Sequence, residues 1–414
     1  MRSLPPTDFV EIESRLSGIT VYAPVIVSEP KLQPEVEFKC PQCGAVTAYN
    51  VDNGQLTCSH CNYAVTPEAK TVGHKAEKFE FTLDNLEKSI YGWGDARKDV
   101  HCQSCGAHST KPAESISATC PFCGSNKVIQ STAHPDQLRP RFLIPFKLDT
   151  EKCQSIVHAW LGSSWMTPKA VTQLSSLGAF TAIYLPFWTF HASTRSSWNA
   201  EVGHTVTERY YDAGSKEWKT RTKIDWRWES GEVGLRIDDL LVPGTERVSQ
   251  FHLGKIQDFD LTKLIDYAPQ YLAGFQAQAY DRALEPAWEL GRQQMREQTR
   301  KACEQQASTS MIRNFSMELD FSDESWRYLL LPCYLAAYQY ESKIYQVLVN
   351  GQTGTVSGQR PVDWNKVWLI IALILSPGVL LGLIGLLTLP LAGIGMAVGG
   401  IGFVLLVIGL IVVI

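Results

Sequence analysis

Eight of the eleven cysteines could bind metal, because they fall into four Cys-x-x-Cys pairs. A Cys-x-x-Cys turn presents two thiolates to one side of a metal ion, and two such turns complete the tetrahedral set that zinc prefers. In each half of this region 14 residues separate the two pairs, which is enough for the hairpin of a zinc ribbon. The sequence predicts two four-cysteine sites: Cys40, Cys43, Cys58 and Cys61, and then Cys102, Cys105, Cys120 and Cys123.

The two cysteine sets form an internal repeat, since each member of the second set lies 62 positions after its counterpart. Four thiolates leave no open coordination position, so we expect two structural zinc ions and no catalytic one. A single shared cluster, iron, and redox disulfides are the alternatives. Each set is complete without the nearby histidines, which we expect at the surface: His60, His101 and His108. Glycines follow three of the ligands, where they permit a positive φ: Gly44, Gly106 and Gly124.

The charge of this region argues against nucleic acid as a partner. Residues 37–129 carry nine Lys or Arg against ten Asp or Glu, and the whole chain has a formal net charge of -4. Nonspecific binding to a phosphate backbone depends on clustered positive charge. We therefore expect the ribbons to contact protein or to serve their own fold. The other three cysteines are scattered, unlike those of a secreted disulfide framework: Cys153, Cys303 and Cys333.

The last 48 residues, 367–414, contain no charged side chain. A helix needs about 20 apolar residues to cross a bilayer core, so this stretch predicts two spans, at about 367–387 and 392–414. A buried hairpin in a soluble core is disfavoured, because both helices are apolar on all sides. Pro377 is expected to kink the first span. Glycines should let the second span approach it closely: Gly393, Gly395, Gly399, Gly400 and Gly402.

Residues that flank the first span indicate its orientation. Trp364 and Trp368 suit a membrane interface, and Arg360 and Lys366 favour the cytoplasmic side. The first residues of the chain lack the apolar core of a signal peptide. We expect a protein of the bacterial inner membrane, with its soluble domains and both termini in the cytoplasm.

Between the ribbons and the spans, the sequence mixes β-rich runs with helical patterns, as in an α+β domain whose sheet is covered by helices. The clearest helix is predicted from Ala283 to Ile312, with a mixed-charge face that we expect to be solvated and not bound to phospholipid head groups. A hairpin is predicted at Glu341-Ser342-Lys343, and a further turn at Asn350–Gly354. Phosphate binding by that turn is disfavoured, because no helix follows it.

Catalytic motifs are missing from the sequence. No phosphate-binding Gly-x-x-x-x-Gly-Lys-Ser/Thr loop, no Gly-x-Ser-x-Gly elbow and no His-Glu-x-x-His helix occurs. The pair Asp238-Asp239 is expected to form a solvated turn. We therefore predict no enzymatic activity. The predicted organisation is an N-terminal arm at 1–36, ribbons at 37–66 and 100–130 around a segment at 67–99, the α+β domain at 131–360, and a two-helix all-α transmembrane anchor at 361–414.

Several of these features together resemble a family of bacterial zinc-ribbon membrane proteins. They are the paired ribbons, the strand at Leu185–Trp188, the turn at Asn350–Gly354 with Gly358–Pro361 after it, and the terminal hairpin. Members are often labelled as TFIIB-type or rubredoxin-like zinc ribbons, or as primosomal-helicase-like. The absent motor motifs disfavour the helicase label here.

Some relatives work beside phage shock protein A and SPFH (flotillin-like) proteins, so the resemblance implies an adaptor that recruits an envelope-stress protein to the lipid bilayer. Our hypothesis is a non-enzymatic zinc-binding membrane scaffold. The alternatives are a membrane-held nucleic-acid-binding ribbon protein of replication or transcription, and a membrane-associated hydrolase. The sequence leaves the oligomeric state open.

Overall fold

The computed structural model describes residues 9–12, 21–24, 39–68, 70–73, 79–80, 97–103, 108–112, 120, 122, 128–132, 138–172, 180–341, 343–388 and 394–413. The chain is multidomain. A four-cysteine cluster lies near its N-terminus, a large antiparallel β-rich domain follows, and two apolar helices end the chain.

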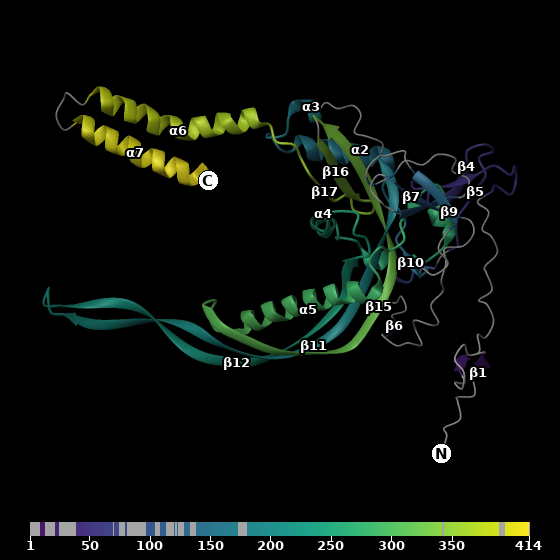
Figure 1. Cartoon of the computed structure of the whole chain (residues 1–414), viewed down its shortest axis with the longest axis horizontal. Coiled ribbons are helices and arrows are strands. Elements are labelled where there is room, and N and C mark those ends of the chain that lie inside the picture. The colour runs from purple at the N-terminus through teal and green to yellow at the C-terminus, as the bar shows by residue number, and fades with distance from the viewer. Residues whose placement is uncertain are drawn as a thin grey trace, which may run out of the picture.

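Three long strands form the centre of the main domain: β11 (Thr181–Asp212), β12 (Glu217–Pro243) and β15 (Ile312–Tyr340). The middle strand, β11, is antiparallel to both of the others. Its pairing with β15 ends at Val202 opposite Ile312, whereas its pairing with β12 continues to Asp212 opposite Glu217. The outer part of β11 and β12 therefore projects as a two-stranded hairpin, which reaches past the end of α5 in Figure 1.

One face of these strands is covered by α5 (Leu284–Gln306), as its amphipathic pattern predicted. The helix can lie close to the sheet at Gly291, where an added Cβ would come within 2.9 Å of the Phe190 ring. Its predicted end at Ile312 is wrong. The helix stops at Gln306 because the next residues bind the hairpin: Ser308 N donates to Glu229 Oε2 (3.1 Å), and Thr309 Oγ1 donates to Gly203 O (2.8 Å).

Shorter elements complete the main domain. The helices are α2 (Thr150–Gly162), α3 (Lys169–Thr172) and α4 (Gln250–Lys255), with 3-10 turns η2 (Leu261–Lys263) and η3 (Pro269–Leu272). The strands of its sheet are β6 (Phe79–Glu80), β7 (Arg97–Cys102), β8 (His108–Pro112), β9 (Val128–Thr132), β10 (Phe142–Leu143), β13 (Ile265–Asp266), β14 (Gln276–Ala277), β16 (Lys343–Asn350) and β17 (Val356–Gly358). Separate small sheets are β1 (Phe9–Ile12) with β2 (Val21–Pro24), and β3 (Thr47–Asn50) with β4 (Gln55–Cys58) and β5 (Ala64–Val65).

The turn after β16 has a structural role. Asn350 is fully buried, and its Nδ2 donates to Ile256 O (2.9 Å) while its Oδ1 accepts from the backbone N–H of Gln352 (2.8 Å). Gly354 has a φ of +84°, a backbone conformation that residues with a Cβ atom seldom adopt. The glycine therefore serves backbone geometry, and the turn closes the domain against the segment after α4.

The chain ends in α6 (Trp364–Leu387) and α7 (Ile394–Val413), which lie side by side in Figure 1. Among the described residues, α6 is the helix long and apolar enough to cross a membrane, and only 11% of its most apolar stretch is buried. The close approach predicted for glycines is present at Gly402, where a Cβ would lie 2.6 Å from Gly382 N. At Gly400 nothing lies within 4 Å.

Candidate metal centre

The first four cysteines lie on two turns of the same construction. Cys40 N donates to Ala45 O (2.7 Å) and Gly44 N donates to Cys40 O (2.8 Å). In the second turn, Cys58 N donates to Tyr63 O (2.8 Å), and the N–H of the residue after Cys61 donates back to Cys58 O (2.9 Å). Each turn thus holds its two thiols on one side of the backbone.

Both turns contain a residue with positive φ directly after their second cysteine. Gly44 has a φ of +72°, as predicted, and Asn62 has a φ of +58° in the equivalent place. The positive φ of Asn62 was not predicted from the sequence, although asparagine tolerates this conformation better than most residues. Gly106 and Gly124, for which the same conformation was predicted, lie outside the described residues.

The four sulfur atoms form one group, all within 4.8 Å of one another. Cys40 Sγ lies 3.4 Å from Cys61 Sγ, and Cys43 Sγ lies 3.5 Å from Cys58 Sγ. Sulfur atoms bound tetrahedrally at about 2.3 Å from zinc lie roughly 3.8 Å apart, so these positions fit a metal ion with little movement. The group is compatible with a zinc ribbon.

The environment of Cys58 favours a thiolate. The backbone N–H of Cys61, assisted by that of His60, lowers the pKa of the Cys58 thiol to about 6, although burial acts in the opposite direction. Amide hydrogen bonds of this kind stabilise the anion that a metal requires. The His60 side chain is exposed and is not part of the sulfur cluster.

The first ribbon docks on the main domain through β3. Tyr49 packs against Tyr271 with ring centroids 5.0 Å apart, and its backbone N–H donates to Ala273 O (3.1 Å). Lys152 of α2 reaches across to Asp52, with Nζ 3.1 Å from Oδ1. A metal here would therefore stabilise the two turns that flank β3 and β4, which is the role of a structural ion.

The second predicted site is described only in part. Cys102, at the end of β7, and Cys120 are both buried in the same apolar cluster. Cys105 and Cys123 lie outside the described residues. In the described part of this region, β7 pairs with both β8 and β9, and His101 lies opposite His108. A second four-cysteine site stays a prediction.

A buried charged cluster lies where the long strands bulge. Arg327 is fully buried, its Nη2 lies 2.9 Å from His191 Nε2, and it forms an ion pair with Asp239. His191 Nδ1 also lies 3.1 Å from Asp238 Oδ1. Burial lowers the pKa of Arg327 to about 10. The prediction of a turn at Asp238-Asp239 is wrong, because both residues belong to β12; Asp239 faces this cluster, whereas Asp238 is exposed to solvent as predicted.

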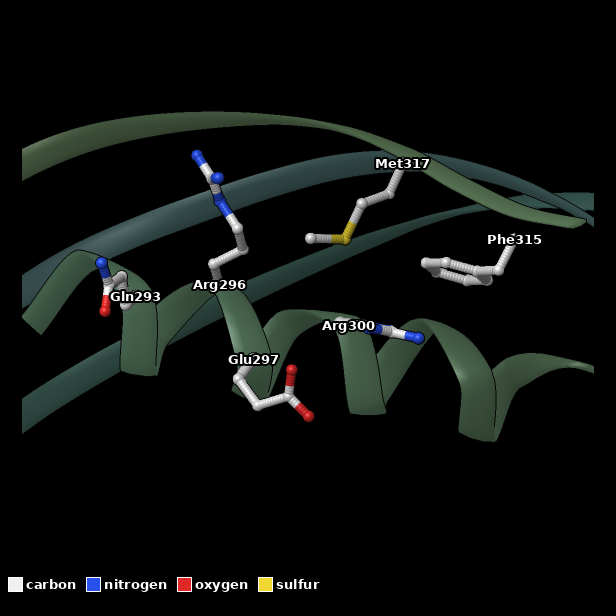
Figure 2. Close-up of a pocket in the computed structure, with 6 residues that line it drawn as sticks. All are labelled: Gln293, Arg296, Glu297, Arg300, Phe315 and Met317. Atoms are coloured by element: carbon white, nitrogen blue, oxygen red, sulfur yellow. The ribbon is translucent and has the colours of Figure 1, made fainter. Parts of the chain in front are cut away.

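A groove of about 320 Å³ lies between α5 and β15. Figure 2 shows Arg296 reaching from the helix towards the strand, with Phe315 and Met317 pointing back. Gln293, Glu297 and Arg300 complete the lining. This lining has one carboxylate and no histidine, cysteine or hydroxyl side chain, so it lacks a nucleophile with a base beside it.

Comparison with known proteins gives one match over most of the chain. The chain is 24% identical over 333 residues to an uncharacterized protein, YdjG, of Bacillus subtilis (strain 168), which covers 80% of this chain and 92% of that protein. No family model and no solved structure matches the chain. The matched length is far greater than a single ribbon, so the similarity includes the main domain.

Proposed function

We propose that this protein is a membrane-held scaffold, stabilised by zinc, that docks a protein partner and has no enzymatic activity of its own. The projecting hairpin at residues 204–229 carries this proposal. Its strands pair with each other and with no further strand in the described part of the chain. Trp218 and Trp228 are 67% and 64% exposed, and a bare two-stranded ribbon is marginally stable in water. Such a surface is suited to contact with another molecule.

Charge favours protein over nucleic acid as the molecule that the hairpin contacts. The hairpin has six Lys or Arg and five Asp or Glu. Three of its basic side chains are already in ion pairs: Lys219 with Asp212, Arg221 with Glu208 and Arg227 with Asp225. Neutralised side chains release few counterions from a phosphate backbone. The aromatic side chains between them still make nucleic acid the second candidate.

The membrane part of the proposal rests on α6. Large apolar side chains cover its surface, among them Leu373 and Leu380, which are 66% and 61% exposed. An apolar surface of this size is costly in water and favourable in lipid. We propose that α6 and α7 both cross the bacterial inner membrane, with the soluble domains and both termini in the cytoplasm.

The identity of the partner is proposed from the family resemblance alone. An envelope-stress protein of the phage shock protein A type, or an SPFH (flotillin-like) protein, is the first candidate. Two structural zinc ions are proposed, one in each ribbon. Their number can be tested by metal analysis of Cys58→Ser and Cys105→Ser, each of which should lose about one zinc per chain. Cys303→Ala, a change at a buried thiol far from both ribbons in sequence, should keep both ions.

The scaffold role is tested by crosslinking and pull-down from solubilised membranes. A triple alanine variant at Tyr211, Trp218 and Trp228 should lose its partner, whereas Phe251→Ala, an equally exposed aromatic on α4, should keep it. Equal capture by both variants would reject the hairpin as the docking surface. If the captured material is DNA or RNA, with an affinity that falls steeply with salt, the nucleic-acid candidate replaces this proposal.

A further inference from the structure

The loop between α2 and α3 is tied to the first turn of α6. Lys366 Nζ donates to two carbonyl oxygens of the loop, Trp165 O at 2.8 Å and Thr167 O at 3.0 Å. The carbonyl between them, Met166 O, accepts from Asp363 N at 2.9 Å. Three consecutive carbonyls of the loop therefore bind the start of α6. These hydrogen bonds fix the position of the loop along the axis of that helix.

This attachment places a third exposed indole at the end of α6 that carries two others. Trp165 is 60% exposed, and Trp364 and Trp368 on α6 are 67% and 64% exposed. The two helix residues are one turn apart, about 6 Å along the axis, and Lys366 lies between them. The backbone of Trp165 is within hydrogen-bonding reach of that lysine side chain. All three tryptophans therefore belong to the same end of the apolar helix.

Cationic side chains accompany the tryptophans at this end. The Arg360 guanidinium lies 3.8 Å from the centroid of the Trp160 ring, and its Nη2 donates to Ser163 Oγ (3.2 Å). Lys169, which begins α3 just after the loop, is exposed. Indoles with lysine and arginine around them are typical of the interface between lipid head groups and acyl chains.

We propose that the loop carrying Trp165 is a second membrane contact, whose indole enters the interfacial layer of the bilayer that α6 crosses. The occupant of this surface is lipid, because three hydrogen bonds hold the loop at the start of the apolar helix α6. The contact fixes the orientation of the β-rich domain over the membrane. This inference depends on the proposed membrane location of α6.

The test is photocrosslinking of the full chain in vesicles of phosphatidylethanolamine and phosphatidylglycerol. Benzoylphenylalanine replaces one residue at a time: Trp165, Leu373 as the helix reference, and Trp228 as an equally exposed control on the hairpin. We expect lipid adducts at 165 and 373 and none at 228. An adduct at 373 without one at 165 would reject this inference alone. The absence of adducts at both positions would also reject the proposed span of α6.

A second measurement keeps the test independent of the bulky crosslinker. Brominated lipids quench tryptophans in the interfacial layer, so the quenched share, taken as the emission lost per chain, should fall in Trp165→Phe and stay unchanged in Trp228→Phe. The phenylalanine leaves the loop's backbone hydrogen bonds to α6 in place. An unchanged quenched share in Trp165→Phe, or a protein adduct in place of a lipid adduct at 165, would overturn the proposal.

Discussion

At the residue scale, the candidate metal centre depends on two backbone conformations as much as on four thiols. Gly44 and Asn62 both have positive φ and donate to the carbonyl of the first cysteine in their turn. These hydrogen bonds close the turns and aim the sulfur atoms at a common point. The residue after each Cys-x-x-Cys pair should therefore control metal retention without touching the metal.

Gly44→Ala should weaken zinc binding. Nothing lies within 4 Å of an added Cβ, so the change isolates the backbone conformation, which costs about 1–2 kcal/mol for a residue with a side chain. That cost corresponds to roughly a 5- to 30-fold loss of affinity, measurable by competition with a chelator. Asn62→Gly should bind zinc at least as tightly as the parent, because it relieves the same strain. Equal weakening in both variants would contradict this account.

Arg327→Leu should strongly destabilise the main domain. The change leaves Asp239 and His191 buried around an apolar side chain, and removal of one member of a buried ion pair costs about 3–5 kcal/mol. Arg236→Leu, which removes an exposed partner of Asp238, should cost about 0–1 kcal/mol. Urea unfolding followed by tryptophan fluorescence compares the two. A loss below about 1 kcal/mol for Arg327→Leu would show that the cluster adds little stability.

At the element scale, features that depend on local sequence patterns were predicted correctly, whereas strand pairing between distant segments was not. The Cys-x-x-Cys spacing and the 3.6-residue period of α5 lie within one segment, so the sequence predicts both. The extent of β11 and β15 depends on pairing across more than 100 residues, as between Trp198 and Met317. The outer hairpin has apolar side chains at alternate positions, Ile224, Trp226 and Trp228, but the pattern does not say which strand pairs with it or where that pairing ends. The end of α5 was missed because Ser308 binds Glu229, a contact with a distant strand.

The pairing of α6 with α7 gives an element-scale prediction. A Cβ at Gly402 would collide with the α6 backbone at Gly382 N and Leu381 C (2.6 and 2.9 Å), whereas Gly400 faces open space. Gly402→Val should therefore push the helices apart at a cost of about 1–3 kcal/mol, and Gly400→Val should have little effect. Thermal unfolding in detergent measures the difference. Identical transitions for the two variants would argue against this helix pair.

At the scale of the whole molecule, the buried core and the exposed projections are separate parts of the structure. The buried residues form clusters on the inner halves of β11, β12 and β15, one with α5 and another with α4. The outer hairpin adds exposed surface and almost no core, since Tyr211, Trp218 and Trp228 are more than half exposed. Figure 1 shows the hairpin and the helix pair α6–α7 as separate projections from the β-rich domain. This arrangement is the one that the proposed scaffold needs, with separate surfaces for the proposed membrane and protein contacts.

Replacement of residues 205–224, which lie beyond the His204–Asp225 pair, by a short glycine-containing turn should therefore remove most of the docking surface and leave the rest intact. The pairing of β11 with β15 ends at Val202, and His204 and Glu229, which bind each other at the hairpin base (3.0 Å), are both kept. We expect unchanged zinc content and a melting temperature within about 2 °C of the parent, because the deleted residues bury little apolar area. Partner capture should be lost. A large fall in melting temperature would mean that the hairpin belongs to the folding core, and its exposed aromatic side chains would then need an explanation other than docking.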